Sequence, residues 1–276
     1  MVWQRNLAKF RGPVFFSHEA MLDRVVEVPR ERRFGLLVES ETQAKSLYRA
    51  VTSVMDQYAL IFTHSRRLLD RFPNARWIPG GGCWIGGPFG GEEGPALFEK
   101  TKNVSILSSN KKRTSLHVLR YSLAEKIERR VPAVDVYRQL GSSLRSPILH
   151  TARGTSVFLG PHLPALDYLR DYRFSIVIEN NRDDLYFTEK LLNCFATGTV
   201  PIYRGARSIG SLFDARGIIQ WNNPRTLLSK LSKLNEDDYA NRWEAIQNNF
   251  DSWSAFRSIE DYIVMHYGRE ISAANA

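Results

Sequence analysis

Short apolar runs alternate with helix-like patterns along the first third of the chain. The runs at 34–40 (FGLLVES), 59–64 (ALIFTH) and 75–79 (ARWIP) have the length and apolar character of buried strands. Residues 44–55 place apolar side chains at helical spacing, and 65–72 has the pattern of a short helix. Strands that alternate with helices in this way predict a parallel sheet that is covered on both faces.

A second alternating series begins near Lys102, after the glycine-rich stretch 80–95. Its apolar runs predict five strands, at 103–110, 134–141, 174–180, 199–205 and 217–221. Helical patterns occupy 116–130, 164–172 and 188–198, and they continue to the C-terminus. The fold class we expect is α/β, with two Rossmann-like domains whose parallel sheets face a cleft. The expected bounds are 1–98 for the first domain, 99–245 for the second, and 246–276 for C-terminal helices that cross back to the first.

Polar residues follow four of the predicted strands, at the edge where open parallel sheets bind their ligands. They are Glu39-Ser40, Thr63-His64, Ser108-Ser109-Asn110 and Glu179-Asn180. The last pair opens the densest polar stretch of the chain, ENNRDDLYFTEK at 179–190. This density of charged and amide groups at the end of a buried strand indicates a site that binds a polar, charged ligand.

The helix that begins near Thr188 carries part of this stretch. Thr188 is a favourable N-cap, and a helix N-terminus attracts anions. Lys190 in the first turn is unfavourable for the helix by the same dipole, and a nearby anion is one explanation for it. Glu189 is suited to accept hydrogen bonds from sugar hydroxyls, and Tyr186 to stack on a nucleobase. The alternative is a capped helix with a Lys–Glu pair on its surface.

A second basic locus follows the strand at 103–110. His117 and Arg120 are three residues apart and share one helix face. Together with Lys190, this face predicts a site for an anionic group, although basic surface residues near a loop are also common. Arg204 and His64, each at a strand end, are further candidates for ligand contact.

At this point the sequence resembles a known family. FSIVIENN…DLYFTEKLLNCFATGTVPIYRG is similar to the donor-binding signature of the α1,3-fucosyltransferases, F-x-x-x-x-E-N-(several)-D-Y-x-T-E-K-x-x-x-A-x-x-x-G-x-V-P-V-x-x-G. The strand KTKNVSILSSN resembles the family's K-x-K-x-V-x-x-x-x-SN strand, and FGLLVES resembles the E-S stretch of its acceptor domain. The resemblance covers 34–222 and is strongest over 172–205.

The resemblance implies a GT-B glycosyltransferase, family 10, that uses GDP-fucose and inverts the anomeric centre. It implies Glu39 as the general base and Lys190 as the contact to the diphosphate. The residues expected to bind the donor are Asn110, His117, Arg120, Glu179, Asn180, Tyr186, Glu189, Lys190 and Arg204. His117 and Arg120 are both open as the counterpart of the family's arginine. No cofactor and no metal are expected, because lysine and arginine supply the positive charge.

The sequence departs from the family in two respects. The proline that commonly follows Glu-Ser is absent after Glu39-Ser40. No N-terminal membrane anchor is found, and the two cysteines, Cys83 and Cys194, fit no zinc spacing and are expected to be free thiols. These features favour a cytoplasmic enzyme of bacterial or viral type, with contact to the inner face of a membrane left open.

The composition narrows the alternatives. The formal net charge is +9, which suits anionic partners, but the basic residues are scattered rather than gathered in one block, so nucleic acid is not expected as a partner. The expected partners are a nucleotide-sugar donor and an oligosaccharide or glycolipid acceptor. Two other interpretations remain: a transferase with a different nucleotide-sugar, and a non-catalytic protein that binds a nucleotide or a carbohydrate.

Overall fold

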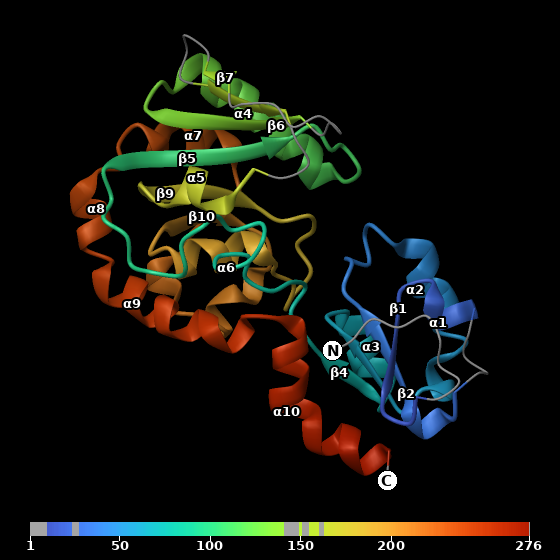
Figure 1. Cartoon of the computed structure of the whole chain (residues 1–276). Coiled ribbons are helices and arrows are strands. Elements are labelled where there is room, and N and C mark those ends of the chain that lie inside the picture. Colours follow the sequence, from blue (N-terminus) through green and yellow to red (C-terminus); the bar gives the residue numbers. More distant parts are fainter. Residues whose placement is uncertain (1–9, 24–27, 141–148, 151–154, 160–162, 276) are drawn as a thin grey trace. The chain divides into compact units, whose positions relative to one another are not determined.

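The computed structural model describes residues 10–23, 28–140, 149–150, 155–159 and 163–275, and it groups the chain into two compact units (Figure 1). Unit 1 comprises Met1–Gly82, Asp183–Tyr186 and Phe256–Ala276. Unit 2 comprises Cys83–Arg182 and Phe187–Ala255. Each unit contains its own parallel sheet, so the fold class is α/β as expected. The domain bounds inferred from the sequence stay a prediction.

Unit 1 is built on a four-stranded parallel sheet in the order β1-β2-β3-β4. Its strands are β1 (Val14–Ser17), β2 (Arg33–Leu37), β3 (Leu60–Thr63) and β4 (Ala75–Trp77). Its helices are α1 (Ala20–Asp23), α2 (Lys45–Val51), α3 (Arg66–Arg71) and α10 (Ile259–Ala274), with short 3-10 turns at Arg30–Arg32 and Met55–Gln57.

Successive side chains of a strand point to opposite faces of the sheet. In unit 1, both of these faces are buried by other elements. Leu37 and Ile61 pack with Met21 and residues of α2, whereas Phe34 and Phe62 pack with residues of α10. Gly35 keeps the first face close to α1: a Cβ atom there would lie 2.4 Å from the terminal carbon of Met21. The sheet of unit 1 is therefore a covered layer, as the continuous apolar runs predicted.

Unit 2 contains a seven-stranded sheet in the order β11-β10-β9-β5-β6-β8-β7, in which only the β7–β8 pairing is antiparallel. The strands are β5 (Lys102–Ser109), β6 (Val134–Leu140), β7 (Leu149–His150), β8 (Thr155–Leu159), β9 (Tyr172–Ile178), β10 (Val200–Arg204) and β11 (Ile219–Gln220). Strand β9 lies centrally between β5 and β10, so its carboxyl end is flanked by theirs.

The α-helices of unit 2 are α4 (Ser115–Arg130), α5 (Ala165–Leu169), α6 (Glu189–Ala196), α7 (Pro224–Leu231), α8 (Glu236–Ala240) and α9 (Trp243–Ser252). Short 3-10 turns lie at Arg207–Ser211, Ala215–Gly217 and Trp253–Phe256. The predicted apolar stripe of α4 faces the core: Leu123 and Ile127 are buried against Ile106 and Val136 of the sheet.

Local capping explains where α6 begins and ends. The side chain of Thr188 accepts a hydrogen bond from the backbone N–H of Lys190, so Thr188 is the N-cap, as predicted. Gly198 follows the helix with φ of +69°, and its N–H donates to the carbonyl of Phe195. This left-handed position favours glycine, and it ends the helix where the sequence placed the end.

Two local predictions differ from the structure. The helix expected over 44–55 ends at Val51, because the hydroxyls of Thr52 and Ser53 donate to the carbonyls of Arg49 and Ala50 and compete with helix continuation. Strand β1 was not predicted from the sequence.

Two expectations about the whole chain concern cysteines and membranes. Cys83 and Cys194 are both free thiols, as expected. Within the described ranges, no helix has the length and apolar character needed to cross a bilayer.

Candidate functional site

Glu179 lies directly after β9 and organises the carboxyl edge of the sheet in unit 2. Its carboxylate is fully buried and accepts hydrogen bonds from the backbone N–H of Thr188, at 2.9 Å, and from the Thr188 hydroxyl, at 2.8 Å. Burial raises the pKa of Glu179, while the neighbouring Lys190 charge acts to lower it. Glu179 therefore ties the N-cap of α6 to the end of β9.

Lys190 extends from the first turn of α6 toward this carboxylate. Its Nζ lies 2.8 Å from Oε1 of Glu189, 3.0 Å from the Thr188 hydroxyl and 3.8 Å from Oε2 of Glu179. Burial acts to raise the pKa of Glu189, but the Lys190 charge and the hydrogen bonds around it hold that pKa below its ordinary value. In the structure, Lys190 is therefore paired with two glutamates of the chain itself, as the alternative of a capped helix with a Lys–Glu pair expected, and a bound anion near Lys190 stays a prediction.

Arg120 supplies a second cation on the same edge. It is buried on α4, and its guanidinium donates to the carbonyl of Ile178 at 3.1 Å. Burial lowers the pKa of Arg120, and the charges of Glu179 and Glu189 oppose that shift. Its Nε has no hydrogen-bond partner among the residues that the structure describes. We call Arg120, Glu179, Glu189 and Lys190 the ionic cluster.

His117 lies one turn before Arg120 and next to the ionic cluster. Its Nδ1 accepts a hydrogen bond from the backbone N–H of Thr114 at 3.2 Å, which completes a capping box at the start of α4. The ring also hydrogen-bonds the side chain of Asn180. With Nδ1 as acceptor, the neutral ring carries its proton on Nε2.

The protonation state of His117 follows from its surroundings. Burial lowers its pKa to about 4, and the charges of Arg120, Lys190 and Lys111 lower it in the same direction. His117 is therefore neutral near pH 7. His117 and Arg120 were both open as the counterpart of the family's arginine, and both lie near the end of β9. They differ in charge: Arg120 is a buried cation, and His117 is a neutral donor.

The remaining donor-site candidates of unit 2 flank this cluster. Asn110 is exposed at the end of β5, and its backbone N–H donates to the carbonyl of Gln139 at 3.3 Å. The Arg204 guanidinium lies 4.9 Å from the centre of the Trp221 ring and donates to the carbonyl of Asn222. Both lie on the carboxyl edge, on the strands that flank β9.

Gly205 explains a glycine of the sequence motif. A Cβ atom at this position would lie 2.2 Å from the hydroxyl of Tyr203 and 2.7 Å from Cγ of Glu179. The backbone N–H of Glu179 also donates to the carbonyl of Arg204. Any side chain at residue 205 would therefore displace the buried carboxylate that holds α6.

Glu39 and Tyr186 belong to unit 1. Glu39 follows β2 and is exposed; its carboxylate accepts a hydrogen bond from Nε2 of Gln43 at 3.2 Å, and its carbonyl accepts one from the Tyr48 hydroxyl at 2.8 Å. Tyr186 is buried, with its ring centre 4.7 Å from that of His64. The stacking of Tyr186 on a nucleobase stays a prediction, as does the role of Glu39.

His64 is the most unusual polar residue of unit 1. It is fully buried at the end of β3, and neither ring nitrogen has a hydrogen-bond partner among the described residues. Burial lowers its pKa to about 4, so the ring is neutral near pH 7.

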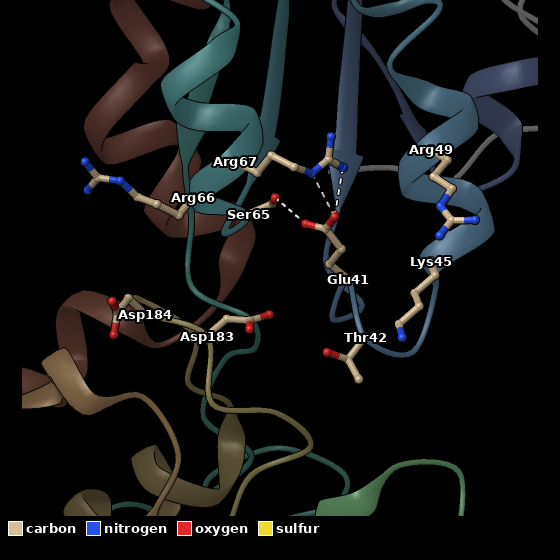
Figure 2. A pocket seen from close by; sticks show the side chains of 9 residues that line it. All are labelled: Glu41, Thr42, Lys45, Arg49, Ser65, Arg66, Arg67, Asp183 and Asp184. Atoms are coloured by element: carbon tan, nitrogen blue, oxygen red, sulfur yellow. Dashed lines mark hydrogen bonds and ion pairs between the residues drawn. The ribbon is translucent and has the colours of Figure 1, made fainter.

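Unit 1 also contains a pocket that the sequence did not reveal (Figure 2). Its volume is about 670 Å³. All of its lining residues are polar or charged: Glu41, Thr42, Lys45, Arg49, Ser65, Arg66, Arg67, Asp183 and Asp184. Three separate segments contribute them, which is why no single motif marked the pocket. Over the described part of the chain, no group of three or more metal-binding side chains occurs.

Comparison with known proteins identifies the family to which the chain belongs. The model of "Glycosyltransferase family 10 (fucosyltransferase) C-term" matches residues 97–253, more than half of the 276 residues. GDP-fucose protein O-fucosyltransferase 3 of Bos taurus is 34% identical over 74 residues, which are 25% of this chain and 16% of the bovine protein. The matched segment therefore spans well under a quarter of that relative's length.

Solved structures support the fold. An α1,3-fucosyltransferase with GDP aligns with a TM-score of 0.55 at 13% identity, over 98% of this chain and 80% of that one. The Anabaena protein Alr3699/HepE, in complex with UDP and glucose, aligns with a TM-score of 0.60 at 11% identity, over 92% of this chain and 76% of that one. The fold is that of the GT-B glycosyltransferases. On the family match, the chain belongs to glycosyltransferase family 10, the fucosyltransferase family.

Proposed function

We propose that this protein transfers fucose from GDP-fucose to a hydroxyl group of an oligosaccharide or glycolipid, with inversion of the anomeric carbon. The observation that carries the proposal is the ionic cluster with His117, held at the carboxyl edge of the sheet in unit 2. The family match supports it, and so does the fold shared with an α1,3-fucosyltransferase that was solved with GDP-fucose.

The ionic cluster suits a leaving diphosphate. When the bond between fucose and the diphosphate breaks, its electron pair stays on a phosphate oxygen, and negative charge grows there. Lys190 and Arg120 supply fixed positive charge, and His117 supplies a neutral N–H donor if Asn180 releases it. Fixed charges of this kind stabilise a transition state without reorganisation. The proposal assigns this neutralisation to the chain's own cations rather than to a metal.

Glu39 is assigned as the general base. The acceptor oxygen forms a bond to the anomeric carbon, and the hydroxyl proton passes to the Glu39 carboxylate. One of its oxygens is already held by Gln43, and the side chain is exposed, so the other oxygen remains open to an acceptor. A general base must come within hydrogen-bond reach of the proton that it removes.

Calorimetric titration with GDP, GDP-fucose and UDP tests the donor assignment. We expect GDP and GDP-fucose to bind and Lys190→Ala to weaken both at least about tenfold, because a charge-assisted contact is lost. Lys126→Ala is the matched control, since Lys126 is exposed on α4. A preference for UDP would replace the donor in this proposal. If no nucleotide binds the folded protein, the donor assignment is wrong.

A further inference from the structure

We propose that the charged pocket of unit 1 binds an acceptor sugar that carries an anionic group, with the anion between Lys45 and Arg49. The inference rests on the proposed function, because it assigns the pocket to the acceptor. It goes further in naming the chemistry of that acceptor: a saccharide with a phosphate, sulfate or carboxylate substituent.

The lining of the pocket indicates a polar occupant. None of its nine lining residues is apolar: four carry cations and three carry carboxylates (Figure 2). Its volume of about 670 Å³ lies within the range of small-molecule sites. The only apolar surface in this lining comes from the carbon atoms of polar and charged residues, whereas a sugar can hydrogen-bond to their polar groups through its hydroxyls.

The cations of the pocket fall into two groups. Arg67 is paired with Glu41, and Arg66 with Asp70, at 2.8 and 2.9 Å respectively. The side chains of Lys45 and Arg49 make neither an ion pair nor a hydrogen bond within the part of the chain that the structure describes. These two side chains are therefore the ones available to an anion.

The sequence of α2 makes this arrangement locally unfavourable. Lys45 lies in the first turn, where a cation opposes the helix dipole, and the N-cap, Ala44, provides no side-chain hydrogen bond. Arg49 lies four residues later, so two like charges share one face of the helix. Costs of this kind are expected where side chains serve a ligand rather than the fold.

The carboxylates define the other side of the pocket. In Figure 2, Asp183 and Asp184 lie away from Lys45 and Arg49, with Glu41 between them. Burial raises the pKa of Asp183, and the charges of Glu41 and Asp184 raise it further. Ionised carboxylates only accept hydrogen bonds, so this side favours hydroxyl donors. This proposal also assigns a role to Asp183 and Asp184, the two aspartates of ENNRDDLYFTEK.

The pocket adjoins the proposed base. Glu41 is two residues after Glu39, so their Cα atoms are no more than about 7.6 Å apart. Glu41 is itself fixed, because it accepts a hydrogen bond from Ser65 at 2.7 Å and pairs with Arg67. A sugar in the pocket would therefore place a neighbouring hydroxyl near Glu39.

The test is an NMR titration of the full chain, without nucleotide, at low ionic strength. The probes are glucose, glucose 6-phosphate, glucose 6-sulfate, glucuronate and inorganic phosphate. We expect at least one anionic sugar to bind about tenfold or more tightly than glucose, since the anion gains charge-assisted hydrogen bonds. Whichever anionic sugar binds most tightly identifies the substituent. Equal affinities for glucose and all three anionic sugars would overturn the proposal.

Variants locate the binding. Lys45→Gln with Arg49→Gln is expected to remove the difference between anionic sugars and glucose, whereas Lys126→Gln leaves it unchanged. Both pocket side chains are exposed, so the fold tolerates their replacement. Asp183→Asn is expected to weaken the anionic sugar but not inorganic phosphate. If phosphate alone binds as tightly as the sugars, or the double variant has no effect, the assignment is wrong.

The donor measurements separate this proposal from the proposed function. If only the pocket assignment fails, GDP-fucose still binds and Lys190→Ala still weakens it. If only the donor assignment fails, the anionic sugar still binds in the absence of nucleotide, and its affinity still depends on Lys45 and Arg49.

Discussion

The charged side chains of the two units differ in their burial and in the contacts that fix them. In unit 2 the ionic cluster is largely buried, and a network of short contacts from β9, α4 and α6 fixes its side chains. In unit 1 the charges of the pocket lie mostly at the surface, on helices of six and seven residues. Buried charges need partners in fixed positions. Under the proposed function, the rigid unit 2 would hold the constant part of the donor, whereas exposed side chains of unit 1 can vary at little cost to the fold.

The largest effect should come from Glu39→Gln. This variant tests whether unit 1 provides the general base while unit 2 binds the donor. We expect turnover with GDP-fucose to fall about 10²–10⁴-fold, because the proton acceptor is lost. GDP affinity should not change, since Glu39 belongs to the other unit. Steady-state kinetics and calorimetry measure the two quantities. An equal loss of both would show that Glu39 acts through the fold.

Glu179→Ala tests the rigidity of unit 2. The variant removes the acceptor of two hydrogen bonds and leaves Lys190 with less compensation, so we expect the free energy of unfolding to fall by about 3 kcal/mol. Denaturant unfolding measures the change. Glu125→Ala on α4 is the control, with a change below about 0.5 kcal/mol. If the two variants are equally stable, the carboxylate is not what holds α6.

Lys100 and Lys102, just before and at the start of β5, give a matched pair in unit 2. Nζ of Lys100 is buried and donates to the carbonyls of Arg170 and Thr197, at 2.8 and 2.7 Å, whereas Lys102 is largely exposed. Lys100→Met should cost about 2 kcal/mol, because buried carbonyls lose their donor. Lys102→Met should cost less than about 1 kcal/mol. Thermal unfolding compares the two, and equal costs would contradict the buried role.

The stability of unit 2 is expected to depend on pH through His117. Its pKa in the folded protein is about 4, against about 6.5 in an unfolded chain, so the unfolded state binds more protons between these values. Its contribution to stability is therefore complete above pH 6.5 and is lost as the pH falls toward 4. His117→Asn should flatten this part of the stability profile relative to the wild type. Parallel profiles for the two proteins would exclude the titration.

The smallest effect is expected for His64→Phe in unit 1. The ring nitrogens of His64 have no hydrogen-bond partner among the described residues, so an apolar ring of similar shape should change stability by no more than about 1 kcal/mol. Chemical denaturation measures this. Loss of turnover without loss of stability would instead show that His64 contacts a substrate.

The elements of unit 2 were predictable because each has a strong local signal. Apolar runs marked β9 and β10, apolar residues interrupted by serine marked β5, and Thr188 with Gly198 marked both ends of α6. The polar motif at 179–190 was recognisable because its residues are constrained by one another: Glu179 holds Thr188, and Gly205 leaves room for Glu179. Such mutual contacts leave fixed spacings in the sequence.

Other features left no local signal. The pocket of unit 1 is assembled from residues near 41, 65 and 183, and their meeting depends on the fold rather than on any spacing. Lys100 appeared in the motif strand only as one of two lysines, and nothing in the sequence indicates which of them is buried. The placement of Asp183–Tyr186 with unit 1, although the rest of the motif belongs to unit 2, is likewise a tertiary result.

Helix α6 is attached at both of its ends, by Glu179 at the N-terminus and by Lys100 beyond the C-terminus. A helix held in this way cannot fray from either end, so its amide protons should exchange with solvent only when unit 2 unfolds as a whole. Helix α2 at the pocket of unit 1 has no such attachment at its N-cap, Ala44, and its amides should exchange through local opening. Hydrogen exchange would then divide the protein into a slow part that carries Lys190 and a fast part that carries Lys45.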